Sequence, residues 1–104
     1  MMSVRFNKDE LVGRWVHSHE EDTADLVVYR NADYPFPPSR GRRAITLEKE
    51  GVAIAEYPGP DDRQARSTGT WTLHGDILII STPGWSHAFK LVEISPDFVT
   101  FHKE

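Results

Sequence analysis

The sequence predicts an all-β fold, a closed, antiparallel, up-and-down barrel of about eight strands that follows a short N-terminal helix. From Arg14 onward, apolar residues recur with a period of two, which is typical of strands with one face toward a core. Compact turn sequences, such as Gly75-Asp76 and Ser95-Pro96-Asp97, separate these segments and join antiparallel neighbours. Closure removes the exposed edges of such short strands, so we favour a barrel over the alternative, a β-sandwich.

The order of elements follows from local signals. Asn7 is a typical N-cap, Glu10 follows three residues later, and Gly13 can end the helix after about two turns. A Pro-rich and therefore stiff loop covers residues 34–41. The expected strands span residues 14–20, 25–31, 42–48, 52–57, 68–74, 77–81, 86–94 and 98–102.

Length and composition narrow the class of protein. The 104 residues form one domain, 1–104, and the absence of cysteine excludes disulfides and a thiol nucleophile. The N-terminal residues are polar, and the longest apolar run, Ile77 to Ile80, is far shorter than the roughly 20 residues of a membrane helix. We therefore expect a cytoplasmic protein with no membrane partner. The net charge of -4 argues against nucleic acid as a partner.

Two short motifs resemble those of a known family. The segment Leu11-Val12-Gly13-Arg14-Trp15 resembles the opening of lipocalin-like proteins, in which a turn of helix leads into a first strand with Gly-x-Trp. The later segment Gly69-Thr70-Trp71-Thr72-Leu73, followed by a Gly-Asp turn, resembles a strand common in small bacterial lipocalin-like domains. The resemblance implies a barrel that binds small, mainly apolar molecules in its interior.

The candidate site combines arginine with aromatic residues. A cluster of three arginines, Arg40, Arg42 and Arg43, accompanies the stiff loop, and their guanidinium groups can clamp a carboxylate or phosphate, or can instead pair with the acidic run Glu20-Glu21-Asp22. The aromatic side chains either line an apolar pocket or fill the barrel completely, and the sequence leaves both open. The predicted ligand-binding residues are Arg40, Arg42, Trp85, His87, Trp15, Trp71 and Tyr57.

Histidine spacing raises the question of a metal. His17 and His19 share one face of the first expected strand, at a spacing that many metal sites use. No dense cluster of further ligands accompanies them, so we predict no metal and no cofactor, with His17 and His19 as the candidate ligands otherwise. The sequence also lacks a Gly-x-Ser-x-Gly elbow, and we favour a protein that is not an enzyme.

Three functions remain in order of preference. The first is a module that binds a small acidic or amphipathic molecule at an arginine-bearing barrel mouth with an aromatic lining. The second is a protein–protein interaction module, an inhibitor or assembly factor, with a filled barrel and an exposed face near Ile77–Ile80. The third is a small enzyme that uses His17, His19 or His87. We expect a monomer or a homodimer.

Overall fold

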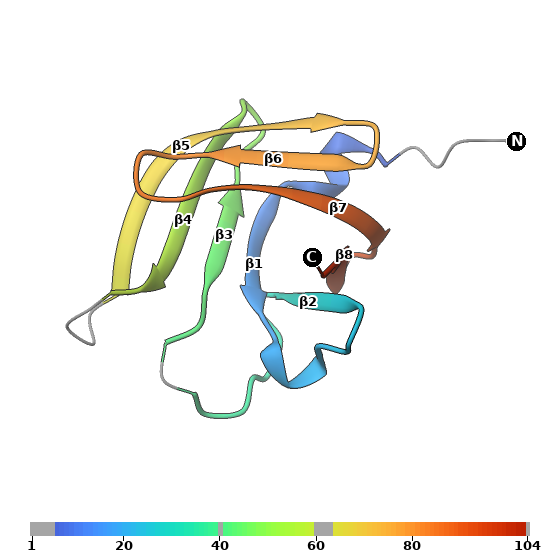
Figure 1. Ribbon diagram of the computed structural model, residues 1–104, viewed down its shortest axis with the longest axis vertical. Helices are drawn as coiled ribbons and strands as arrows, with labels where there is room; N and C mark the ends of the chain where they lie inside the picture. The colour runs from blue at the N-terminus through green and yellow to red at the C-terminus, as the bar shows by residue number, and fades with distance from the viewer. Residues whose placement is uncertain (1–5, 40, 60–63, 104) are drawn as a thin grey trace, which may run out of the picture.

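The computed structural model describes residues 6–39, 41–59 and 64–103 (Figure 1). These residues form two 3₁₀ turns and a series of β-strands, and none of them belongs to a helix long and apolar enough to cross a membrane. The elements are η1 (Lys8–Leu11), β1 (Gly13–His17), η2 (His19–Glu21), β2 (Leu26–Asn31), β3 (Ala44–Leu47), β4 (Val52–Pro58), β5 (Gln64–His74), β6 (Ile77–Ser81), β7 (Ser86–Ile94) and β8 (Phe98–His102).

The strands close into one antiparallel barrel, which confirms the predicted all-β fold and its closure. Its order is β1-β2-β8-β7-β6-β5-β4-β3, with β3 returning to β1. The last three strands have the predicted bounds, because each is separated from the next by a short turn with strong sequence signals. Figure 1 shows β5, β6 and β7 as neighbouring strands on one side of the barrel.

The strand order corrects the prediction of an up-and-down barrel at one place. β1 lies between β2 and β3, and β2 pairs with β8 instead of β3. Because β2 and β3 are both antiparallel to β1, they run in the same direction and a hairpin cannot join them. The two described ends of the connection accordingly lie at opposite ends of β1: Ala32 donates to the Arg14 carbonyl at 3.1 Å, and the Arg43 carbonyl accepts from His17 at 2.8 Å.

The N-terminal helix is shorter than expected. It is a single 3₁₀ turn, η1, instead of two turns of helix, and Asn7 caps it by accepting a hydrogen bond from the Asp9 amide at 2.9 Å. The turn ends at Leu11, and Gly13, with a φ of 142° that residues with a Cβ rarely adopt, redirects the chain into β1.

The first strand also stops before its expected end. β1 ends at His17 instead of residue 20, because Ser18 is the N-cap of η2 and its hydroxyl donates to the Glu21 carboxylate at 2.8 Å. Asp22 then fixes the start of β2 by accepting from the Val28 amide at 2.9 Å. Side chain to backbone bonds of this kind compete with strand pairing.

One end of the barrel is packed by η1. Leu11 is fully buried, and its carbonyl accepts from the Trp15 indole at 2.9 Å. The Lys8 ammonium lies 5.1 Å from the Trp71 ring, whose indole N–H donates to the Glu48 carbonyl. We call this the η1 end. The core that continues from it consists of Leu11, Trp15, Tyr29, Ile45, Leu47, Ala53, Trp71, Leu78, Ile80, Phe89, Leu91, Val99 and Phe101.

At the opposite end the β6–β7 turn folds onto the inner face of β5. A Cβ on Gly69 would lie only 1.9 Å from the Ser81 carbonyl oxygen, so glycine is what permits this approach. Farther along, the Gly84 amide donates to the Ser67 hydroxyl at 3.0 Å. These contacts place Trp85, the residue that follows, beside the barrel interior.

Candidate functional site

A group of aromatic, histidine and arginine side chains faces inward at the end of the barrel opposite η1. Paired residues on neighbouring antiparallel strands project on the same side of the sheet. His87 therefore shares the face of its partner Ile80, a core residue, and His17 shares the face of Tyr29. Arg43 is in phase with the buried Ile45 of β3. We call this group the inner-face cluster: His17, Tyr29, Arg43, Trp85, His87 and Phe89.

The members of the inner-face cluster form a continuous series of contacts. His17 stacks on Tyr29 with 5.0 Å between ring centroids, and Tyr29 meets Phe89 edge to face at 6.2 Å. The His87 ring centroid lies 4.5 Å from that of Phe89 and 6.0 Å from that of Trp85. The guanidinium carbon of Arg43 lies 5.5 Å from the centre of the Trp85 ring. Arginine above an indole is a favourable cation–π arrangement.

Burial changes steeply across the inner-face cluster. Tyr29 and Phe89 are only 2% and 8% exposed, Trp85 is half-buried, and His87 and Arg43 are exposed. An inward-facing side chain can be exposed only where solvent reaches the barrel interior. This end therefore presents an aromatic floor beneath a polar rim, the composition that small-molecule sites share.

The charge of Arg43 is not neutralised by an ion pair with any residue in the described segments. The acidic side chains nearby pair with residues other than Arg43. Asp22 lies 2.9 Å from His17 Nε2, Glu20 binds Arg42, and Glu21 binds Arg30. A guanidinium without a carboxylate partner, next to partly desolvated aromatic rings, is suited to hold an anion.

Tyr29 is the buried polar member of the inner-face cluster. Burial raises the pKa of its hydroxyl to about 12, and the guanidinium of Arg43 acts in the opposite direction. The Asp22 carboxylate adds to the increase. The phenol is therefore neutral at physiological pH and can donate a hydrogen bond at the floor of the site.

Three of the predicted site residues come together at this end. Trp85 and His87 belong to the inner-face cluster, and Tyr57 lies on the inner face of β4, in phase with the buried Ala55. A Cβ on Gly84 would lie 2.3 Å from the Tyr57 hydroxyl, which places Tyr57 against the β6–β7 turn.

The predicted tryptophans Trp15 and Trp71 lie deeper. Each is 2% exposed and belongs to the core, and each uses its indole N–H on a backbone carbonyl. Trp71 lies toward the η1 end, beside Lys8. The two rings thus fill the barrel, while the side chains nearer the opposite end meet solvent.

Arg42, one of the two predicted arginines, does not reach the inner-face cluster. Arg42 lies on the outer face, where it donates to both oxygens of Glu20, to the His17 carbonyl and to the Pro37 carbonyl, with its guanidinium over Phe36. This is the pairing with the acidic run that the sequence left open. Arg40 lies outside the described residues.

Arg43 and Tyr29 belong to the site although neither was among the predicted ligand-binding residues. For Arg43 the sequence does contain a pattern that indicates the inner face, because residues 43, 45 and 47 share one face of a strand and Ile45 and Leu47 are apolar. For Tyr29 the position depends on its pairing with His17, which no local pattern specifies.

The histidines of the possible metal site are separated by the end of β1. His17 remains on the strand and contacts Asp22, whereas His19 begins η2 and lies 3.1 Å from the Ser39 hydroxyl. Their ring centroids are 6.1 Å apart. In the described part of the chain, no three His, Asp or Glu side chains are arranged to hold a metal ion.

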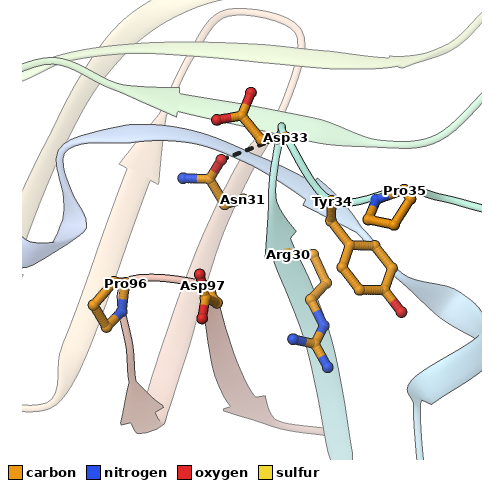
Figure 2. A pocket seen from close by; sticks show the side chains of 7 residues that line it. All are labelled: Arg30, Asn31, Asp33, Tyr34, Pro35, Pro96 and Asp97. Carbon is orange, nitrogen blue, oxygen red and sulfur yellow. Dashed lines mark hydrogen bonds between the residues drawn. The ribbon is translucent and has the colours of Figure 1, made fainter.

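A concavity away from the inner-face cluster lies where the end of β2 meets the β7–β8 turn. Figure 2 shows its lining, which encloses a volume of about 400 Å³ and combines two carboxylates with one guanidinium. The guanidinium of Arg30 is already engaged, since it donates to both oxygens of Glu21 and packs over Tyr34. The lining residues are Arg30, Asn31, Asp33, Tyr34, Pro35, Pro96 and Asp97.

Comparisons with protein-family models, with curated proteins and with solved structures found no match to this chain. The fold therefore defines the class, a closed eight-stranded antiparallel barrel, and its function rests on the site itself.

Proposed function

We propose that this protein is a binding module for a small amphipathic molecule, held at the end of the barrel opposite η1. The observation that carries the proposal is the exposure of Arg43 and His87, which face inward above the buried Phe89. A filled barrel that acts only through its outer surface gives no reason for inward-facing polar side chains to meet solvent.

The site offers separate partners for the two parts of such a molecule. Its apolar body would pack on Trp85 and Phe89, whose ring centroids are 5.8 Å apart. Its polar group would lie at the rim, near Arg43. The supporting strands are paired on both sides, so the rings are held in place before binding and little entropy is lost when the ligand arrives.

The resemblance to lipocalin-like barrels supports the same proposal. Its two motifs have structural roles in this chain, since Gly13 redirects the backbone into β1 and Gly69 admits the β6–β7 turn. Trp15 and Trp71, the tryptophans of those motifs, form the packed part of the interior. Together these residues leave the opposite end for a ligand.

A neutral fluorescent probe tests the proposal directly. N-phenyl-1-naphthylamine emits strongly only when its rings leave water, so titration into the protein should give a saturable increase in emission at one site per chain. Trp85→Ala should weaken binding about tenfold, because a large aromatic contact surface is lost.

The matched control is Ile79→Ala, which removes an apolar side chain from the outer face of β6, where Ile79 is 38% exposed. This variant should bind the probe as the wild type does. Absence of saturable binding by the wild type, or equal loss in both variants, would contradict a site at the inner-face cluster.

A further inference from the structure

We propose that the ligand is an organic monoanion, a flat apolar body with a single acidic group, and that Arg43 is the residue that selects its charge. This inference rests on the proposed function and names the class of molecule for the same site. It is carried by hydrogen-bond donors that have no partner in the described structure and by the balance of charge around them.

The rim of the inner-face cluster is rich in unused donors. The guanidinium of Arg43 has no ion-pair partner among the described residues; it lies over the Trp85 ring, and its hydrogen bond to the Tyr29 hydroxyl uses only part of its five N–H donors. Within the same segments, the indole N–H of Trp85 makes no hydrogen bond, unlike those of Trp15 and Trp71. A ligand that brings acceptors satisfies these groups.

The carboxylates near the site are engaged with other residues and do not serve as the acceptors for Arg43 and Trp85. Asp22 accepts from the Val28 amide and lies against His17, so both of its oxygens are engaged. Glu20 is held on the outer face by Arg42. The positive charge of Arg43 therefore remains available on the inner face.

The backbone explains why only one of two adjacent arginines is presented there by the described part of the chain. Arg42 and Arg43 are adjacent, and successive side chains of an extended segment point to opposite faces. Arg42 is thus directed outward to Glu20, and Arg43 is directed inward to Trp85. One guanidinium matches one acidic group, which favours a monoanion over a ligand with several charges.

The short separation between Arg43 and Trp85 sets the shape of the ligand. Because the guanidinium carbon is 5.5 Å from the indole centre, an acidic group on Arg43 leaves its own body beside Trp85, His87 and Phe89. Flat rings make the most contact with such a wall of rings. An aryl carboxylate or aryl sulfonate has this form.

A matched pair of probes separates charge from shape. The anion 8-anilinonaphthalene-1-sulfonate carries the same ring system as the neutral N-phenyl-1-naphthylamine and adds one sulfonate. Both are titrated at neutral pH and fixed ionic strength, and the ratio of the two dissociation constants reports the preference for the anion. We expect the wild type to bind the anion about tenfold more tightly than the neutral probe.

Substitutions at two arginines assign the preference. Arg43→Gln should reduce the ratio of the two dissociation constants to about one. Arg66→Gln, on the outward face of β5, causes the same loss of charge and should keep the ratio of the wild type. Arg43→Lys retains the charge without the fork and should give an intermediate ratio.

The outcomes are distinct. If the wild type binds the neutral probe but shows no preference for the anion, or if Arg43→Gln keeps the preference, this inference fails and the proposed function stands. If neither probe binds, both fail. Thermal unfolding of each variant confirms that it is folded, and the ratio in the wild type decides the inference even if one variant is not.

Discussion

Arg42 and Arg43 are neighbours in the chain, but their guanidinium groups lie on opposite sides of the barrel wall. Arg42 donates to the Glu20 carboxylate at 2.8 Å on the outside, and Arg43 lies over Trp85 on the inside. The first group ties the end of β1 to the start of β3, since Arg42 also donates to the His17 carbonyl. The two arginines should therefore respond differently to substitution.

Arg42→Ala should lower the midpoint of urea denaturation, because it leaves Glu20 and two backbone carbonyls without their donor. Arg43→Ala should leave the midpoint near that of the wild type, since Arg43 is exposed and has no ion pair in the described segments. Equilibrium denaturation followed by circular dichroism measures both. Equal midpoints for the two variants would show that the outer contacts of Arg42 contribute nothing to stability.

Acid should weaken the contact between Arg42 and Glu20 in a defined pH range. Hydrogen bonds from Arg42 lower the pKa of the Glu20 carboxyl from 4.5 to about 2. A carboxyl whose pKa is lower in the folded state stabilises the fold above its unfolded pKa, and this contribution is lost as the pH falls from 4.5 toward 2.

The measurement is the urea midpoint of the wild type and of Glu20→Gln across that range. The advantage of the wild type should be constant above pH 4.5 and should shrink below it. Glu21, whose pKa is lowered mainly by Arg30, is retained in both proteins and cancels in the comparison. A difference that does not change with pH would rule out this ion pair as its source.

High pH should destabilise the fold through ionisation of the Tyr29 hydroxyl. Burial raises the pKa of its hydroxyl from 10.0 to about 12, so the folded state favours the neutral phenol. Because the folded pKa is the higher one, this contribution is fully present below pH 10 and is lost as the pH rises toward 12. The near-ultraviolet absorbance of phenolate, taken as the difference between wild type and Tyr29→Phe, should rise near pH 12. A rise near pH 10 would mean that the Tyr29 hydroxyl meets bulk solvent.

Trp15→Ala should destabilise the fold by about 3–5 kcal/mol, because it leaves a cavity in a packed core. The side chain is 2% exposed, and its indole N–H would no longer satisfy the Leu11 carbonyl. Chemical denaturation gives the free energy of unfolding. Trp85→Ala, at a half-buried position, should cost clearly less, and the reverse order would exchange the roles assigned to the two residues.

Gly69→Ala should destabilise the fold by about 1–3 kcal/mol through overpacking. The new methyl group would lie 1.9 Å from the Ser81 carbonyl oxygen, and this neighbour is backbone that cannot rotate away. Thr68→Ala, at an exposed position on the opposite face of β5, is the control and should have a small effect. If the two variants have similar unfolding free energies, the β6–β7 turn does not press on Gly69.

The barrel could be predicted because its signals are local. Alternation in β7 and the turns at Gly75-Asp76 and Ser95-Pro96-Asp97 fix strand bounds without reference to the rest of the chain. The position of β1 between β2 and β3 could not be predicted in the same way. It depends on the pairing of Leu26 with His102, two residues that are far apart in the sequence.

The site was partly predictable for the same reason. Trp85, His87 and Tyr57 were identified by residue type and strand phase, and they meet at one end of the barrel. The prediction named Arg42 for the site, whereas the structure places Arg43 there. The difference depends on a residue distant in the sequence, because Glu20 binds Arg42 on the outer face. Residue type is identical at the two positions, and only the phase of Ile45 and Leu47 distinguishes them.

Because β2 pairs with β8, the last strand, β2 cannot complete its strand pairing until late in the synthesis of the chain. β2 is made early, but its neighbour on one side, Phe98–His102, leaves the ribosome only after most of the chain. Until then Val27 and Tyr29 lack part of their packing, and the edge of β2 is open to other chains. Until β8 has emerged from the ribosome, the chain therefore exposes an unpaired strand edge to which chaperones can bind.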